Sequence, residues 1–207
     1  MSAWPGKFVI GLTGNIATGK SEVRKMLEQL GAGGIDADAL AHQSMKSQEP
    51  AFPQILAAFG QEILGEDGEI DRRRLGQIVF SDPNALARLE AIIHPEVRKK
   101  VEQIIRQAPE QVIVIEAIKL VEAGYPALCD SIWTTWSSPA VQMSRLVGQR
   151  GMSDALANQR IAVQPPQEQK IAAADVVLSN NRGLEELWQQ VLENWNKLFL
   201  SDEIPAD

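Results

Sequence analysis

Short apolar runs alternate with longer stretches of helical periodicity along much of the chain. Phe8–Leu12 and Val112–Ile115 have the length and composition of buried strands. After the first run, Val23 and Leu27 recur at helical spacing. We predict strands near residues 7–12, 33–36, 111–116, 130–136 and 174–178. Because these strands alternate with helices, the pattern favours an α/β fold with a five-stranded parallel sheet flanked by helices.

Two segments do not fit a plain sheet with crossover helices. Residues 39–110 show mainly helical periodicity and are too long for one crossover, so we expect a helical side lobe there. Residues 141–171 are polar and contain glycine and proline, which favours a lid. Residues 1–38, 111–140 and 172–200 would form the core. Within the lobe, we expect His94-Pro95 to interrupt a helix, since proline removes a backbone hydrogen bond.

Composition narrows the possible partners. Lys and Arg number 20 against 27 Asp and Glu, for a net charge of −7 and a pI near 5.0. This argues against a nucleic-acid-binding surface, which is usually basic. No apolar run is long enough to span a membrane, and the N-terminus lacks the apolar segment of a signal peptide. The single Cys129 fits a reducing compartment. We therefore expect a cytoplasmic protein, as a monomer or weak homo-oligomer.

Candidate chemistry begins directly after the first strand. Gly14, four further residues and Gly19-Lys20-Ser21 have the spacing of a phosphate-binding loop, in the strand-loop-helix context that it needs. The backbone N–H groups and the helix N-terminus would hold phosphates. Lys20 would reach the β- and γ-phosphates, and the Ser21 hydroxyl would bind Mg²⁺. The predicted nucleotide-binding residues are Gly14, Asn15, Ile16, Ala17, Thr18, Gly19, Lys20, Ser21 and Glu22. A glycine-rich turn without a ligand is the less favoured interpretation, because motif and context agree.

Acidic residues follow two other predicted strands. Asp36 and Asp38 end the second strand and Glu116 ends the third, at the sheet edge where ligands bind in open parallel sheets. Asp36 is equally well explained as a helix N-cap. Asp38 is our candidate for the base that accepts a proton from an attacking hydroxyl. Glu116 could hold Mg²⁺ or its water, or be neutralised by the next helix.

Arginines in and beside the lid complete a possible phosphoryl-transfer site. Arg145, Arg150 and Arg160 could stabilise charge on a transferring phosphoryl group, although a solvated helical hairpin is the alternative. A lid favours transfer to an acceptor over hydrolysis, because closure excludes water. The residues alone indicate a small-molecule kinase and do not identify the acceptor. The basic residues 72–74 are better explained as a solvated helix face than as a substrate contact.

Nearly the whole chain resembles the dephospho-CoA kinase family. The resemblance rests on residues 11–21, Ile35-Asp36-Ala37-Asp38 with Ala41-His42, Leu89-Glu90 with Ile93-His94-Pro95-Glu96-Val97, Val121-Glu122-Ala123-Gly124, Gln142 with Arg145-Leu146 and Arg150, Arg160-Ile161 with Gln164, and Ala174-Asp175-Val176-Val177 with Asn180. It implies a P-loop NTPase fold with a core, a helical CoA-side lobe and a lid. It also implies ATP and Mg²⁺, with the ribose 3′-hydroxyl of dephospho-CoA as acceptor.

The resemblance assigns expected roles to single residues. It makes Asp38 the base, with Lys20, Arg145 and Arg150 as the other catalytic residues. It places the loop at Asn180 beside adenine. Three residues are the candidates for binding the acceptor: Asp38, His42 and His94.

Some positions depart from the family pattern. Glu22 stands where threonine is usual, Lys119 where leucine is usual, and Ser179 where aspartate is usual. Two alternatives therefore stay open beside dephospho-CoA kinase: another kinase on the same scaffold, and a non-catalytic ATP-binding protein.

Overall fold

The computed structural model describes residues 3–200, which form two compact units. The first unit comprises the chain up to Ile35 and from Gln107 onward, and the second comprises Asp36–Arg106. None of the helices described is both long and apolar enough to cross a membrane.

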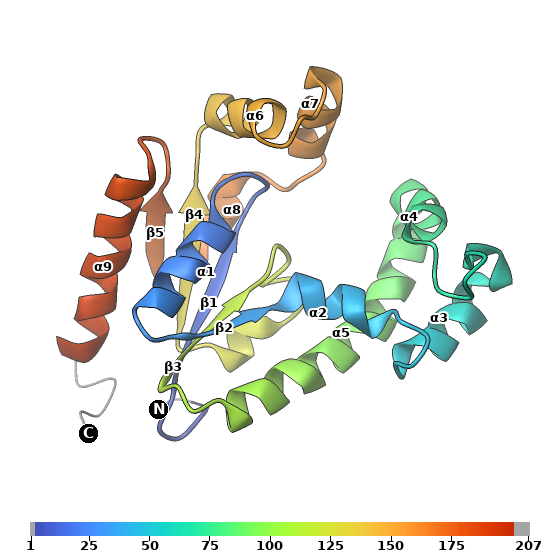
Figure 1. Ribbon diagram of the computed structural model, residues 1–207, viewed down its shortest axis with the longest axis horizontal. Helices are drawn as coiled ribbons and strands as arrows, with labels where there is room; N and C mark the ends of the chain where they lie inside the picture. Colours follow the sequence, from blue (N-terminus) through green and yellow to red (C-terminus); the bar gives the residue numbers. More distant parts are fainter. Residues whose placement is uncertain (1–2, 201–207) are drawn as a thin grey trace. The chain divides into compact units, whose positions relative to one another are not determined.

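The first unit is built on a sheet with its phosphate-loop strand in the middle. The strands are β1 (Phe8–Gly14), β2 (Gly33–Asp36), β3 (Val112–Glu116), β4 (Ser131–Trp136) and β5 (Val176–Ser179). Their order is β2-β3-β1-β4-β5, and β1 pairs in parallel with both β3 and β4 (Figure 1). The predicted fold class and all five strands are confirmed, with ends shifted by up to two residues. The parallel pairing brings the carboxyl ends of β1, β3 and β4 to one edge.

The helices of the first unit are α1 (Lys20–Gln29), α6 (Pro139–Gly148), α7 (Asp154–Ala162), α8 (Gln167–Ala172) and α9 (Leu184–Leu200), with a 3₁₀ turn η2 (Tyr125–Leu128). Two of them, α1 and α9, pack against the sheet, and three others, α6, α7 and α8, lie between β4 and β5 in the chain. Alternate residues of β1, including Ile10 and Leu12, pack with Val23 and Leu27 of α1 and with the buried stripe of α9. This packing fixes the strand and helix that flank the phosphate loop.

The second unit is helical. It contains α2 (Ala37–Ser44), α3 (Ala51–Phe59), a 3₁₀ turn η1 (Gln61–Ile63), α4 (Arg72–Ser81) and α5 (Pro83–Gln107), whose last residue lies just beyond the unit. The carboxylate of Asp71 caps α4 by accepting from the N–H groups of Arg73 and Arg74.

The expected interruption at His94-Pro95 is wrong. Helix α5 runs from Pro83 to Gln107 with Pro95 inside it. The buried side chains Ile93 and Val97 lie on both sides of the proline and belong to one continuous stripe. A proline inside a helix costs about 3 kcal/mol. Burying this stripe along the whole helix outweighs that local cost, because each fully buried apolar side chain contributes about 1.5–3 kcal/mol.

Candidate active site

The phosphate loop runs from the end of β1 to the start of α1 and depends on two glycines. Gly14 has φ +148° and Gly19 has φ +100°. A Cβ atom on Gly14 would lie 2.3 Å from Thr135 Oγ1, and one on Gly19 would lie 2.2 Å from Asn180 Nδ2. Both positions therefore require glycine for backbone conformation and for space.

Side chains from the segment after β4 hold the loop in shape. Gln142 Nε2 donates to the carbonyl oxygen of Ile16 at 2.6 Å, and the Ile16 N–H donates to Gln164 Oε1 at 2.6 Å. Asn15 Nδ2 donates to the carbonyl oxygen of Pro165 at 2.8 Å. The predicted lid segment thus contacts the start of the loop directly.

Lys20 folds back over the loop. Its residue is only 8% exposed, and its ammonium lies 3.4 Å from the carbonyl oxygen of Asn15. The ammonium is therefore held at the beginning of the loop, where a bound phosphate would meet both it and the backbone N–H groups.

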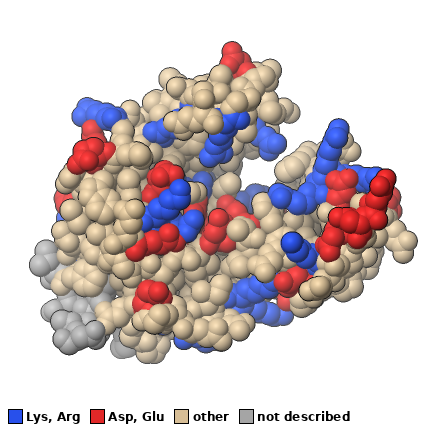
Figure 2. All heavy atoms as spheres, in the orientation of Figure 1, with Lys and Arg blue, Asp and Glu red and all other residues tan. Residues whose placement is uncertain are grey.

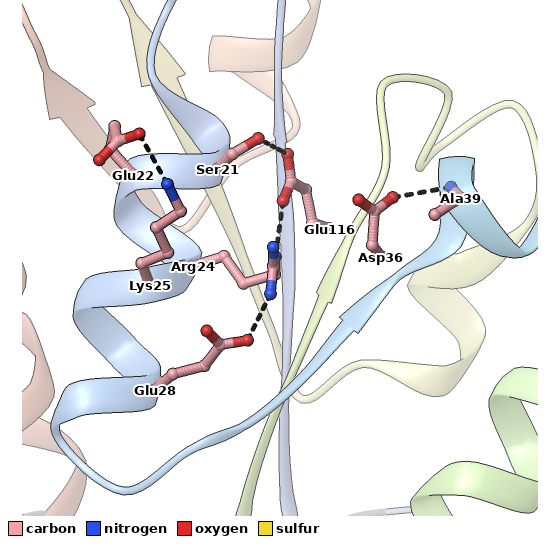
Figure 3. Close-up of polar contacts among 8 residues, drawn as sticks. All are labelled: Ser21, Glu22, Arg24, Lys25, Glu28, Asp36, Ala39 and Glu116. Carbon is pink, nitrogen blue, oxygen red and sulfur yellow. Dashed lines mark hydrogen bonds and ion pairs between the residues drawn. The ribbon is translucent and has the colours of Figure 1, made fainter.

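Ser21 and Glu116 meet beside the loop. Ser21 Oγ donates to Glu116 Oε1 at 2.7 Å, and Arg24 Nε donates to Glu116 Oε2 at 2.8 Å (Figure 3). Arg24 also pairs with Glu28. Burial alone would lower the pKa of Arg24, but the hydrogen bond to Glu116 and the charges of Glu28 and Glu116 outweigh it, so its pKa is raised. The Glu116 side chain therefore accepts from the Ser21 hydroxyl through one oxygen and from Arg24 through the other.

This pair of oxygen ligands fits magnesium. Mg²⁺ in kinases is usually bound by one or two protein oxygens, with phosphates and waters completing its octahedron. The hydroxyl of Ser21 and the carboxylate of Glu116 supply such ligands at one point. Among residues 3–200 there is no group of three or more His, Cys, Asp or Glu that could hold a metal by themselves. Two protein oxygens are too few to bind a cation alone. They suit a cation that is also bound by the phosphates of a nucleotide.

Arg145, on α6, forms hydrogen bonds with the phosphate loop and with Asn180, the residue that follows β5. Its Nη1 donates to the Ala17 carbonyl oxygen at 3.0 Å and to Ser137 Oγ at 3.1 Å. Its Nη2 donates to the carbonyl oxygen and to Oδ1 of Asn180, at 2.9 and 2.8 Å. Asn180 in turn donates from Nδ2 to the Thr18 carbonyl oxygen at 3.0 Å. Burial lowers the pKa of Arg145. Arg145, Asn180 and the loop, which the sequence had linked only through the resemblance, form one hydrogen-bonded network.

A pocket of about 490 Å³ opens beside this network. Its lining is formed by Ala17, Gly19, Lys20, Ser21, Glu22, Arg145, Gln149, Arg150, Asn180, Gly183 and Leu184. Three cationic side chains and one acidic side chain face this space, which favours an anionic ligand. Figure 2 shows Lys and Arg atoms along the lower edge of the α6–α7 segment. The size lies within the range of small-molecule sites.

Glu22, the acid in this lining, is engaged elsewhere. Its Oε1 lies 3.2 Å from Lys25 Nζ, one helical turn along α1 (Figure 3). Both side chains are about half exposed. The paired charge reduces the repulsion that Glu22 would exert on a phosphate.

The remaining predicted residues belong to the second unit. Asp38 lies in the first turn of α2, and Asp36 caps that helix by accepting from the Ala39 N–H at 2.8 Å. The capping interpretation of Asp36 is thereby confirmed. His42 is exposed in the last turn of α2, with Nε2 2.9 Å from Arg72 Nη2, and His94 is partly buried in α5. The structure thus joins the loop, Ser21, Glu116, Arg145, Arg150 and Asn180 within the first unit, and describes Asp38, His42 and His94 within the second.

Sequence reasoning missed several polar contacts at the loop. Gln142 and Gln164 entered only as part of a resemblance, and Lys170 of α8 was not singled out. Lys170 is buried and contacts Thr13 and the Ile118 carbonyl oxygen. A single lysine in a polar segment gives no signal of burial, because its hydrogen-bond partners, Ile118 and Thr13, lie 52 and 157 residues away in the sequence.

Comparisons with known proteins agree with this geometry. The model of the dephospho-CoA kinase family matches residues 8–186. A dephospho-CoA kinase of Geobacter sulfurreducens is 43% identical over 194 residues, covering 92% of this chain and 98% of the relative. One of Streptomyces avermitilis is 40% identical over 199 residues, covering 96% and 97%.

Solved structures show the same relationship. A Thermus thermophilus protein superposes with a TM-score of 0.81 at 30% identity, covering 92% of this chain and 97% of its own. The dephospho-CoA kinase from Campylobacter jejuni gives a TM-score of 0.66 at 25% identity, covering 94% and 98%. A shikimate kinase from Acinetobacter baumannii, at 12% identity and a TM-score of 0.51, shares the fold alone. A family match over most of the length, together with a phosphate loop and a cation-lined pocket in one unit, shows that this chain belongs to the dephospho-CoA kinase family.

Proposed function

We propose that this protein transfers the γ-phosphate of ATP to the ribose 3′-hydroxyl of dephospho-CoA. The observation that carries the proposal is the pocket in which the phosphate loop, Lys20, Arg145 and Arg150 meet, in a chain of this family. Phosphoryl transfer depends mainly on positioning and on neutralising charge on the phosphoryl oxygens. The residues around this pocket provide both.

Residues of the first unit bind the donor in this proposal. Backbone N–H groups of residues 14–22 hold the β- and γ-phosphates, and Lys20, Arg145 and Arg150 offset their charge. Asn180 lies beside adenine. Ser21 and Glu116 would hold Mg²⁺, which would offset negative charge on the phosphates.

Residues of the second unit act on the acceptor. Asp38 accepts the proton of the 3′-hydroxyl as that oxygen attacks the γ-phosphorus, and the bond from the γ-phosphorus to the β-phosphate oxygen breaks to release ADP. His42 and His94 contact dephospho-CoA. His42 is exposed on α2, which leaves its side chain accessible to a ligand.

The proposal also covers the cellular compartment and the oligomeric state. The single cysteine is consistent with a reducing, cytoplasmic environment. We also propose a monomer or weak homo-oligomer. Sedimentation of the purified protein at micromolar concentration should give a mass close to the 22.7 kDa of one chain, and a tight dimer would contradict it.

A panel of phosphate acceptors tests the proposed reaction. The assay follows ATP consumption and the mass of the phosphorylated product with dephospho-CoA, adenosine, nucleoside monophosphates and shikimate. We expect turnover with dephospho-CoA and a product phosphorylated at the 3′ position. Lys20→Met should abolish it, whereas Lys197→Met, which removes an exposed lysine paired with Glu193 on α9, should not.

The two alternatives give different results in the same assay. Turnover with another acceptor but not with dephospho-CoA would indicate a different kinase on this scaffold. ATP binding without consumption in the presence of any acceptor would indicate a non-catalytic ATP-binding protein, the alternative kept open by the departures at Glu22, Lys119 and Ser179.

A further inference from the structure

The two oxygens of the Glu116 carboxylate are held by different partners. Oε1 accepts from the Ser21 hydroxyl at 2.7 Å, and Oε2 accepts from Arg24 Nε at 2.8 Å (Figure 3). Glu116 ends β3 and is only 4% exposed, so its orientation depends on these two neighbours more than on water. Oε1 is the oxygen on the side of Ser21, which lines the pocket.

Arg24 is itself fixed by a second carboxylate. Its Nη1 donates to Oε1 of Glu28, one turn further along α1. The Glu28 carboxylate lies over Gly34 of β2, at a place that a Cβ atom on Gly34 would also occupy. The Arg24 side chain is 20% exposed. The guanidinium is thus held between a carboxylate of α1 and a carboxylate of β3, and Oε2 of Glu116 is held with it.

Mg²⁺ and Ca²⁺ make different demands on such a carboxylate. Mg²⁺ binds oxygens at about 2.0–2.1 Å in a near-ideal octahedron, whereas Ca²⁺ binds more of them, at about 2.3–2.6 Å, and often takes both oxygens of one carboxylate. Oxygens at right angles around the ion are then about 2.9 Å apart for Mg²⁺ and about 3.3–3.7 Å apart for Ca²⁺. The 2.7 Å between Ser21 Oγ and Glu116 Oε1 is nearer to the first value.

We infer that Arg24 is a positioning residue that makes the proposed cation site selective for Mg²⁺ over Ca²⁺. The inference rests on the proposed binding of Mg²⁺ by Ser21 and Glu116 and adds a residue to that site. Because Arg24 holds Oε2, the carboxylate offers the cation one oxygen, Oε1. A cation bound by both oxygens would also lie close to the guanidinium and be repelled by its charge. Arg24 acts through Glu116 and contacts neither the nucleotide nor the cation.

Binding of ATP in excess Mg²⁺ or excess Ca²⁺ measures this selectivity without turnover. Calorimetry gives the Kd for ATP with each cation, and the ratio of the two is compared, because removing one positive charge alters the attraction of both divalent cations alike. Wild-type protein should bind ATP at least about 10-fold more tightly with Mg²⁺ than with Ca²⁺. Arg24→Met has a side chain of similar reach without a donor, and the ratio should fall by about 10-fold.

Arg24→Gln separates the hydrogen bond from the charge. The amide nitrogen of glutamine stands at the same position along the side chain as Nε of arginine, so it can still donate to Glu116 Oε2. This variant should keep the cation ratio within about 2-fold of wild type. Lys25→Met is the control, since it removes a positive charge from the next position of α1, where the ion pair is with Glu22. It should leave the ratio unchanged.

A double variant tests the mechanism of selection. Glu116→Gln has one side-chain oxygen and cannot bind a cation through two. In that background Arg24→Met should change the ratio by less than about 2-fold, because there is no second carboxylate oxygen to release.

Each contrary result is distinct. A wild-type ratio near one would overturn the inference, and this measurement holds even if circular dichroism shows that Arg24→Met does not fold. An unchanged ratio in folded Arg24→Met would mean that Arg24 only stabilises the structure. Equal losses in Arg24→Met and Arg24→Gln, a loss in Lys25→Met, or an undiminished effect in the Glu116→Gln background would also contradict it. Wild-type protein that phosphorylates a different acceptor would overturn the proposed function and leave this role of Arg24 standing, because the binding measurements contain no acceptor.

Discussion

The phosphate loop holds Ala17 in a backbone conformation that residues with a side chain rarely adopt. Among the described residues it is the non-glycine residue with positive φ, at +59°. Its carbonyl oxygen accepts from Arg145, and its methyl group packs with Leu146 and Ala157. The loop therefore holds a side-chain-bearing residue in the left-handed region, because contacts on both sides stabilise it.

Ala17 should tolerate glycine but not valine. A β-branched residue is a strong outlier at positive φ and would overfill the contact with Leu146. We expect Ala17→Val to reduce the free energy of unfolding by about 2–4 kcal/mol. In Ala17→Gly, relief of strain and loss of a buried methyl group oppose each other, so the change should stay within about 1 kcal/mol. Urea denaturation of both variants measures this, and a valine variant as stable as wild type would contradict it.

Cys129 should be unreactive in the folded protein. Burial, with a smaller contribution from the charge of Asp130, raises the pKa of its thiol to about 12. The thiol also donates to the Tyr125 carbonyl oxygen at 3.2 Å. At pH 8 the reactive thiolate should be roughly 10³-fold scarcer than for an ordinary cysteine of pKa about 8.5. Labelling with a thiol reagent should be slow in native protein and fast in urea; rapid native labelling would show that the thiol is exposed and ordinary.

At the scale of elements, helices of the second unit are shaped by packing and by capping. Helix α5 continues through Pro95, and α4 begins at the Asp71 cap with three arginines in its first turn. Cations at a helix N-terminus oppose the helix dipole. The ion pair of Arg74 with Asp71 and the bond of Arg72 to His42 compensate part of this effect.

Replacing Pro95 by alanine should stabilise the helical unit. The side chain of Pro95 is exposed, so its loss removes little packing. The variant regains a backbone N–H for the carbonyl group one turn earlier and loses the steric conflict of the ring. We expect the free energy of unfolding to rise by about 1–3 kcal/mol, measured by chemical denaturation. Lys99→Ala, at another exposed position of α5, is the control and should change stability by less than about 0.5 kcal/mol. A destabilised Pro95→Ala variant would mean that the proline ring makes a needed contact.

The contact between α2 and α4 should be visible in the titration of His42. Partial desolvation of the imidazole, and next the charge of Arg72, lower its pKa, while the charges of Asp38 and Asp36 act in the opposite direction. Since the folded state then binds fewer protons than the unfolded state, this group reduces stability as the pH falls below about 6.5. The NMR titration midpoint should lie below that of a free histidine and should rise in Arg72→Met. A midpoint unaffected by Arg72→Met would contradict the coupling, and His42→Gln identifies the resonance.

At the scale of the whole molecule, the proposed reaction draws on both units. The residues proposed to bind the donor lie in the first unit, and the proposed base, Asp38, lies in the second. Binding of ATP and transfer of its phosphoryl group should therefore be separable by mutation. A residue needed only for proton transfer affects the rate and leaves nucleotide affinity intact.

Asp38→Asn should show this separation. It preserves size and removes the proton acceptor, so kcat should fall by about 10²–10⁴-fold while the Kd for ATP changes by less than about 2-fold. Asp36→Asn is a matched control two residues away, because asparagine caps helices as well as aspartate does. Steady-state kinetics with dephospho-CoA and nucleotide-binding calorimetry check both variants. A near-normal rate in Asp38→Asn would remove it as the base.

Much of this architecture could be predicted before any coordinates were known. The apolar runs located all five strands, and the spacing of Gly14, Gly19, Lys20 and Ser21 located the phosphate loop. Both signals are local, since burial in a parallel sheet demands continuous apolar runs and a phosphate loop demands glycine at particular positions. The path of α5 through Pro95 was not predictable in the same way. A local rule for proline competes there with burial of a long stripe, and packing decides between them.

The sequence by itself determined the fold class, the family and the residues available for chemistry, because these follow from patterns among neighbouring residues. Only the tertiary structure decided which of those residues meet. It joined Ser21 to Glu116 across 95 positions, Arg145 to Asn180 and the Ala17 carbonyl group, and Lys170 to Thr13 across 157 positions. The physical reason is that strand order and parallel pairing, not distance along the chain, bring strand ends together. The charge and burial of each group at that edge then depend on partners that no local pattern identifies.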